Sequence, residues 1–269
     1  MATHHSASSR NRVLLLALLP WVTLSGCGQD EGGSLPEASV PVQGGTLRLV
    51  LESPTSLDPA LTEDVYTSTV INQVFSGLLT FDADLNPRPD LAQSWTVSRD
   101  GLEYAFTLRG DARYHNGRTV TAEDVVYSFT RLVSPDIHPG IIQDYLQLID
   151  GVPDYTAGRA ERVTGLAAPD PATVVIRLEK PYPSFLFVLC MDQAKIVPRE
   201  EVERLGPEGF GRTPVGTGPF RLADWVPDES MILVANPDYF GSPAYLDSVV
   251  VLHFPPDQGQ RERRAFYSG

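Results

Sequence analysis

The sequence has few cysteines and lacks the residue patterns of common enzyme sites. Its 269 residues include two cysteines, Cys27 and Cys190, which excludes a framework of several disulfide bridges. Neither Gly-x-Ser-x-Gly nor His-Glu-x-x-His occurs, the patterns of a hydrolase nucleophile and of a zinc protease. Adjacent acids such as Glu200 and Glu201 are typical of a solvated helix face. We therefore expect a protein that is not an enzyme and has neither a cofactor nor a bound metal.

Two short patterns resemble ligand-binding loops but lack a required residue. Asp82, Asp84 and Asn86 have the spacing of the first ligands of a calcium loop, but Pro87 stands where that loop requires glycine. Gly216-Thr217-Gly218 is followed by proline and no third glycine, which argues against a phosphate loop. The two glycines instead predict a close approach of the backbone, either to neighbouring chain or to a ligand.

A long hydrophobic run is also missing. The apolar run from Val13 to Val22 has ten residues, whereas a membrane-spanning helix needs about 20. Arginines 10 and 12 precede it and Leu24-Ser25-Gly26-Cys27 follows, the layout of a secretory signal peptide. The cysteine at the cleavage point makes the segment similar to a bacterial lipoprotein signal. We predict removal of residues 1–26, a lipid on Cys27, and a periplasmic or other extracytoplasmic location, anchored to a membrane.

Positive charge is scarce as well. The chain has 21 basic and 34 acidic residues and a net charge of −13, so a nucleic-acid partner is not expected, because phosphate binding needs a basic face. Residues 27–43 are polar, rich in glycine and proline, and predict a flexible tether. Cys190 lies in an apolar run over 185–191, which predicts a buried, unreactive thiol.

Apolar periodicity and turn residues predict a mixture of helices and strands. We expect a helix over 65–79, a helix that is capped by Thr121, carries two acids in its first turn and ends near Leu132, and a short helix over 198–205. A turn is expected over 81–87. Strands are expected over 45–52, 104–109, 173–179, 220–225, 231–235 and 249–254. This order favours an α/β or α+β fold with a mixed sheet.

Several short segments follow one another along the chain in a distinctive order. They are Ser56-Leu-Asp-Pro59, Phe75-Ser-Gly-Leu-Leu79, Leu91-Ala-Gln-Ser-Trp95, Ser98-Arg-Asp-Gly101, Tyr104-Ala-Phe-Thr-Leu-Arg109, Tyr114-His-Asn-Gly117, Thr121-Ala-Glu-Asp-Val-Val-Tyr-Ser-Phe129, Pro214-Val-Gly-Thr-Gly-Pro-Phe220 and Asn236-Pro-Asp-Tyr-Phe240. In this order and spacing they resemble family 5 of the extracellular solute-binding proteins. Members of this family are the peptide, dipeptide and nickel receptors of ABC importers.

The resemblance implies an α/β fold like one lobe of a type II periplasmic binding protein, with a mixed sheet and an inserted α+β subdomain. Residues 44–62 would begin the lobe, 63–166 would form the inserted subdomain, and 167–269 would continue the lobe. Family members are about twice as long as this chain, so the resemblance also implies that a second lobe is absent from it.

The resemblance also implies where a ligand would bind. In oligopeptide-binding members, the segment after Leu-Asp-Pro pairs with the bound peptide as an added strand, which is a known recognition mode. Glu63 and Val65 match the family's Glu-x-Val there, although the acids of this segment could instead cap the helix that follows. Tyr145 is a possible substitute for an aromatic ligand contact, because Ile142 stands where the aromatic is expected. Gly216 and Thr217 are further candidates.

The function implied is that of a monomeric substrate-binding component that captures peptides and delivers them to the permease and ATPase subunits of an ABC importer. Two alternatives stay open at this point: a receptor for nickel or another small solute, and a sensor lipoprotein with the same fold and no role in transport. Neighbouring genes for permeases and ATPases would separate a receptor from a sensor.

Overall fold

The computed structural model describes residues 42–254. Cys27, the predicted signal peptide and most of the predicted tether lie outside these residues. The elements, in chain order, are β1 (Thr46–Glu52), η1 (Pro59–Leu61), α1 (Val65–Val74), β2 (Leu79–Phe81), β3 (Pro87–Pro89), β4 (Ala92–Val97), β5 (Glu103–Leu108), α2 (Ala122–Leu132), α3 (Ile142–Leu146), α4 (Val152–Thr156), β6 (Leu166–Asp170), β7 (Thr173–Arg177), α5 (Phe185–Val188), η2 (Asp192–Ala194), α6 (Arg199–Arg212), β8 (Phe220–Val226), β9 (Ser230–Ala235) and β10 (Ser248–Phe254).

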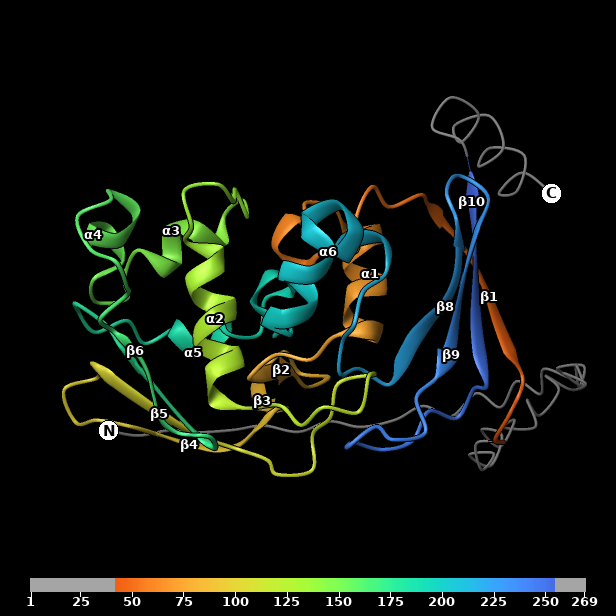
Figure 1. The fold of residues 1–269 in the computed structure, drawn as a ribbon. Helices are drawn as coiled ribbons and strands as arrows, with labels where there is room; N and C mark the ends of the chain where they lie inside the picture. The colour runs from red at the N-terminus through yellow and green to blue at the C-terminus, as the bar shows by residue number, and fades with distance from the viewer. Residues whose placement is uncertain (1–41, 255–269) are drawn as a thin grey trace, which may run out of the picture. The chain divides into compact units, whose positions relative to one another are not determined.

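The first sheet joins the two ends of the described chain. Its strand order is β1-β10-β9-β8, with β1 parallel to β10 and the other pairs antiparallel, so the predicted mixed sheet is confirmed. Alternate residues of β10, among them Val249 and Val251, are buried on the face that α1 covers, as the two-residue repeat of a strand requires. Figure 1 shows α1 beside β8, with β9, β10 and β1 beyond it.

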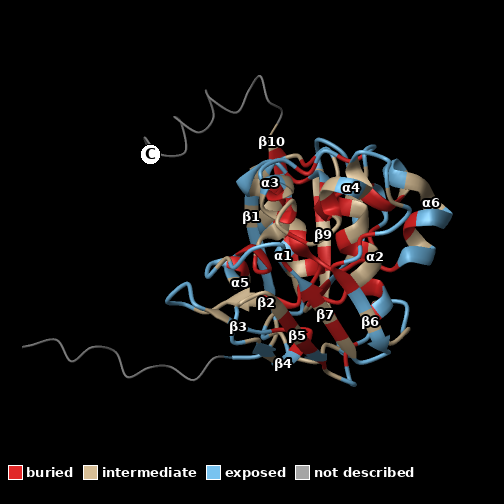
Figure 2. Ribbon diagram, turned by 90° about the vertical axis from the view of Figure 1, so that its left-hand side faces the viewer, coloured by how far each residue is buried: buried red, intermediate tan, exposed pale blue. Residues whose placement is uncertain are grey.

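The second sheet is antiparallel throughout, in the order β4-β5-β7-β6. Helix α2 packs against β6 and β7, and the apolar side chains of α2 and of the strands share one core. Figure 2 shows buried residues concentrated on β5 and β7 and on the helices above them. The sheet contains residues on both sides of position 166, where we expected the inserted subdomain to end.

The predicted helix over 65–79 is five residues too long. It ends at Val74, because Phe75 has an extended backbone (φ −125°, ψ 153°). Phe75 and Leu78 are fully buried as their spacing suggested, but Phe75 belongs to the core of the first sheet and Leu78 to that of the second. The chain crosses from one core to the other after the helix ends, and both residues are apolar because each is buried in one of these cores. The apolar spacing therefore continues past the end of the helix.

The remaining predicted elements are found with small changes. All six predicted strands are present, and β2 and β3 flank the predicted turn over 81–87. The short helix predicted over 198–205 continues to Arg212 after a break at Gly206 (φ 71°, ψ 170°), which precedes Pro207. Cys190 is 4% exposed and donates to the Leu186 carbonyl at 3.3 Å. Burial raises its pKa to about 11, which fits the expected unreactive thiol.

Within residues 42–254, no helix is both long and apolar enough to cross a bilayer.

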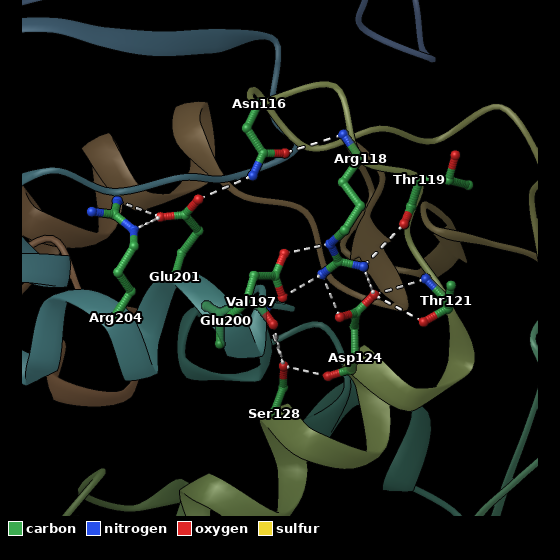
Figure 3. Close-up of polar contacts among 10 residues, drawn as sticks. All are labelled: Asn116, Arg118, Thr119, Thr121, Asp124, Ser128, Val197, Glu200, Glu201 and Arg204. Atoms are coloured by element: carbon green, nitrogen blue, oxygen red, sulfur yellow. Dashed lines mark hydrogen bonds and ion pairs between the residues drawn. The ribbon is translucent and has the colours of Figure 1, made fainter.

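The start of α2 is held by a network of charges that Figure 3 shows. Asp124, which is 5% exposed, accepts from the Thr121 backbone N–H at 2.8 Å and so completes the predicted cap. Its carboxylate also binds two guanidinium nitrogens of Arg118, at 2.6 and 2.9 Å. Arg118 in turn binds the Glu200 carboxylate at 2.5 Å. Helix α2 is thereby joined through Arg118 to α6.

We expect Asp124→Asn to lower the free energy of unfolding by about 2 kcal/mol, because it removes a buried charge partner of Arg118 and weakens the helix cap. Urea denaturation at pH 7 measures the change. Glu123→Gln is the matched control, since Glu123 is also in the first turn but exposed, and it should stay within about 0.5 kcal/mol of the wild type. Equal losses in the two variants would contradict the assignment.

Candidate functional site

The candidate site lies where the chain leaves the first sheet. Because β1 and β10 are parallel, with Glu52 opposite Phe254, their carboxyl ends meet at one edge, the place where ligands bind in many α/β sheets. The chain that follows β1 runs along this edge through η1 to the start of α1. In Figure 1 this is the segment that passes over the upper end of α1.

A buried ion pair fixes the first part of this segment. Asp58 has no exposed surface, and its two carboxylate oxygens bind the two terminal nitrogens of Arg131, Nη1 at 2.8 Å and Nη2 more closely. The same carboxylate accepts from the Ala60 backbone N–H at 3.1 Å and caps η1. Burial opposes the charge of Arg131, but the bonds to Asp58 and its negative charge raise the pKa of Arg131 overall. The pair joins the segment after β1 to the end of α2.

The next three residues form an extended stretch, in which Glu63 and Asp64 are exposed and Thr62 is buried. Thr62 (φ −78°, ψ 120°) and Asp64 (φ −128°, ψ 156°) both have strand-like backbone. The Thr62 carbonyl accepts from the Gln193 side chain at 3.0 Å. Glu63 and Val65 are exposed, Val65 by 78%, and within residues 42–254 no hydrogen bond engages the backbone N–H of either residue. This backbone is therefore open to pairing with an added strand.

The acids of this segment could bind a ligand or cap the following helix, and the structure assigns the cap to one of the two acids. Asp64 is the helix cap: its carboxylate accepts from the Thr67 backbone N–H at 2.8 Å and from the Thr67 hydroxyl at 2.7 Å. Glu63 has no part in that cap. Its carboxylate thus stays available to a cationic group of a ligand, while the adjacent residue stabilises the helix.

Gly216 and Gly218 approach neighbouring chain. A Cβ on Gly216 would lie 1.9 Å from the Val74 carbonyl oxygen, and one on Gly218 would lie 2.3 Å from that of Gln73. The Gly218 N–H donates to the Val74 carbonyl at 2.8 Å. Between the two glycines, the buried Thr217 hydroxyl accepts from the Ser76 N–H at 3.1 Å. The structure accounts for all three residues by contacts with the end of α1, and ligand contact by Gly216 and Thr217 stays a prediction.

His115, for which the sequence indicates a surface or structural histidine, completes this contact. Its Nδ1 accepts from the Gly216 N–H at 3.3 Å, so its Nε2 carries the proton and donates to the Gly218 carbonyl at 3.2 Å. Both nitrogens are engaged only in the neutral ring. Burial lowers the pKa of His115 to about 4, against a smaller opposing effect of the Gly218 carbonyl.

Among residues 42–254, no contact joins Tyr145 to the extended stretch. It lies on α3, half-buried, and stacks on Tyr182 with ring centroids 6.2 Å apart. Ile142, the residue at the position of the expected aromatic, has no exposed surface. A ligand role for Tyr145 remains a prediction from the resemblance alone.

Comparison with known proteins gives consistent matches. The sequence profile of the bacterial extracellular solute-binding proteins, family 5, matches residues 86–266. The chain is 32% identical to dipeptide-binding protein DppE of Bacillus subtilis and 34% identical to periplasmic oligopeptide-binding protein OppA of Escherichia coli, over 191 residues of each. Each alignment covers 70% of this chain and 35% of the relative.

A solved structure agrees in fold. Haemophilus influenzae OppA in complex with the peptide RPPGFSPFR superposes with a TM-score of 0.71 at 28% identity, over 83% of this chain and 45% of that one. The chain thus spans less than half the length of the proteins it matches.

The neutral state of His115 predicts a loss of stability in mild acid. The folded pKa of about 4 lies below the ordinary value of 6.5, so the unfolded chain takes up the proton first as pH falls. His115 should therefore contribute a decrease of about 2 kcal/mol in the free energy of unfolding between pH 7 and pH 5. Urea denaturation across that range measures the decrease.

His115→Asn should be less stable at pH 7 and should lose less stability on acidification. His138→Asn is the control, because His138 is exposed, and it should keep the pH dependence of the wild type. Burial also lowers the pKa of His253. The stability of both variants should therefore still depend on pH through His253. An unchanged pH dependence in His115→Asn would refute the assignment.

Proposed function

We propose that this chain, a member of the bacterial extracellular solute-binding proteins of family 5, is the substrate-binding component of an ABC importer and captures peptides outside the cytoplasmic membrane. The observation that carries the proposal is the extended stretch Thr62–Asp64 at the carboxyl edge of the first sheet, which is exposed at Glu63 and Asp64. Its strand-like backbone at Thr62 and Asp64 and the open N–H groups of Glu63 and Val65 suit the addition of a peptide strand.

Pairing through the main chain also suits a receptor of broad specificity. Backbone hydrogen bonds supply affinity for any extended peptide, while side-chain pockets tune the preference. The Glu63 carboxylate, which no intramolecular bond occupies among the described residues, would favour peptides with an amino group or a basic side chain near it. The names of the relatives DppE and OppA, dipeptide-binding and oligopeptide-binding, support this ligand class.

The open N–H of Val65 can be removed without disturbing the helix. Val65 is the first residue of α1, a position that proline tolerates, and the backbone of Asp64 has the geometry that a residue before proline requires. We expect Val65→Pro to weaken binding of trialanine and trilysine about tenfold, because the peptide loses one hydrogen-bond donor. Isothermal titration calorimetry on the chain measures the change.

Val65→Ala is the matched control, since it removes the same side chain and keeps the N–H. It should bind both peptides like the wild type, and thermal unfolding should show that all three proteins are folded. If the wild type binds neither peptide, peptide capture by this chain is wrong. If Val65→Pro binds as well as Val65→Ala, the backbone pairing is wrong.

We also propose that Cys27 carries a lipid that anchors the protein to a membrane. The polar segment 28–43 would then connect this anchor to the rest of the chain. Expressed from the full sequence in a bacterial host fed radiolabelled palmitate, the wild type should be labelled and should sediment with membranes. Cys27→Ser should lose the label and the membrane association. Cys190→Ser, which changes the other cysteine, should keep both, and a labelled Cys27→Ser protein would disprove the anchor.

A further inference from the structure

A cavity of about 470 Å³ lies at the other end of α1. It is bounded by the last residues of that helix, by β2 and β3, and by the loop 239–242. In Figure 1, β2 and β3 lie at the lower end of α1, opposite the extended stretch. Ten helical residues separate the two ends, about 15 Å. The cavity is thus distinct from the proposed peptide edge.

The cavity has the opposite charge balance from the chain as a whole. The sequence carries 34 acidic and 21 basic residues, but three basic side chains line the cavity against two acidic ones. The basic residues are Arg88, Arg109 and Lys195, and the acidic residues are Asp90 and Asp192. A cavity with this lining suits a ligand of negative charge.

Lys195 is the group whose bonding is incomplete. It is one of two lysines in the sequence, is 4% exposed, and forms no ion pair within 4.0 Å with any acid among residues 42–254. Burial lowers its pKa, while the charges of Asp90 and Asp192 oppose that effect. An ammonium group has three donors and no acceptor, and burying it without partners is costly.

The other charged groups of the cavity have partners of their own. Asp90 accepts from the Gly77 N–H at 3.1 Å, and Asp192 accepts from the Asn72 side chain at 2.7 Å. Arg109 binds Asp111 at 2.7 Å and the Phe240 carbonyl at 3.0 Å. Arg88 donates through Nε to the Phe81 carbonyl at 3.3 Å and is exposed to solvent. Lys195 is therefore the buried cation of the cavity that still has hydrogen bonds to give.

The remaining wall of the cavity has an apolar part beside polar side chains such as Asn72, Ser76 and Thr80. Phe75, Phe81 and Phe240 contribute aromatic rings, and Pro89 and Pro219 contribute further apolar surface. The volume is several times that of an inorganic anion, which leaves room for an apolar body beside the charged group. The two carboxylates in the lining would repel a dianion such as phosphate more strongly than a monoanion.

We propose that this cavity binds a small organic carboxylate, whose carboxylate group accepts hydrogen bonds from Lys195 and whose apolar body packs against Phe75 and Phe81.

The presence of two lysines makes a direct test practical. With lysine labelled with ¹³C at Cε, the chain gives two Cε signals, and Lys180→Met assigns them by removing one; Lys180 is exposed. Titration with benzoate at pH 7 should shift the Lys195 signal to saturation and leave that of Lys180 in place. Absence of a saturable shift at Lys195 would overturn the proposal, as would equal shifts of both signals.

Substitutions of Lys195 separate the effect of its positive charge from that of its side-chain shape. Lys195→Met should weaken benzoate binding at least tenfold, because it removes a charge-assisted hydrogen bond, whereas Lys180→Met should bind like the wild type. Lys195→Arg keeps the charge and should bind more tightly than Lys195→Met, and thermal unfolding checks that each variant is folded. Tighter binding of inorganic phosphate than of benzoate would overturn the carboxylate assignment, and unchanged benzoate binding in folded Lys195→Met would overturn the role of Lys195.

Discussion

The buried pair of Asp58 and Arg131 determines how the two halves of the described chain fit together. Asp58 follows β1 of the first sheet, and Arg131 lies in the last turn of the helix that covers the second sheet. Removing either partner would leave a buried charge without compensation, a loss of about 3–5 kcal/mol in comparable cases. The same aspartate caps η1 and so directs the chain into the extended stretch. One carboxylate thus connects the packing of the molecule to the geometry of its candidate site.

Much of the fold could be predicted from the sequence because the elements that matter are long and periodic. All six strands predicted from alternation are present, and the Thr121 cap with its acidic first turn identified α2 correctly. The end of α1 could not be predicted, since Phe75 and Leu78 continue the apolar spacing while entering different cores. Helices α3, α4 and α5 have four or five residues, too few for a periodic pattern.

The candidate site was predictable in part. Glu63 and Val65 lie exposed on the expected segment, but the sequence could not assign the cap to Asp64 rather than Glu63, because both acids precede the helix. The partners of His115 could not be predicted, because both are backbone groups about 100 residues away. The contacts of Gly216 and Gly218 with α1 depend on tertiary packing, and the glycines predicted a close approach without naming the partner.

The separation of tasks between Glu63 and Asp64 has a consequence for the evolution of the protein. Asp64 stabilises the start of α1, whereas Glu63 and Val65 project from it and contribute little to folding. Substitutions at these two exposed positions can therefore accumulate without compensating changes elsewhere. A lineage can alter the chemical character of this edge by single mutations while its fold stays intact, so ligand preference can diverge faster than architecture.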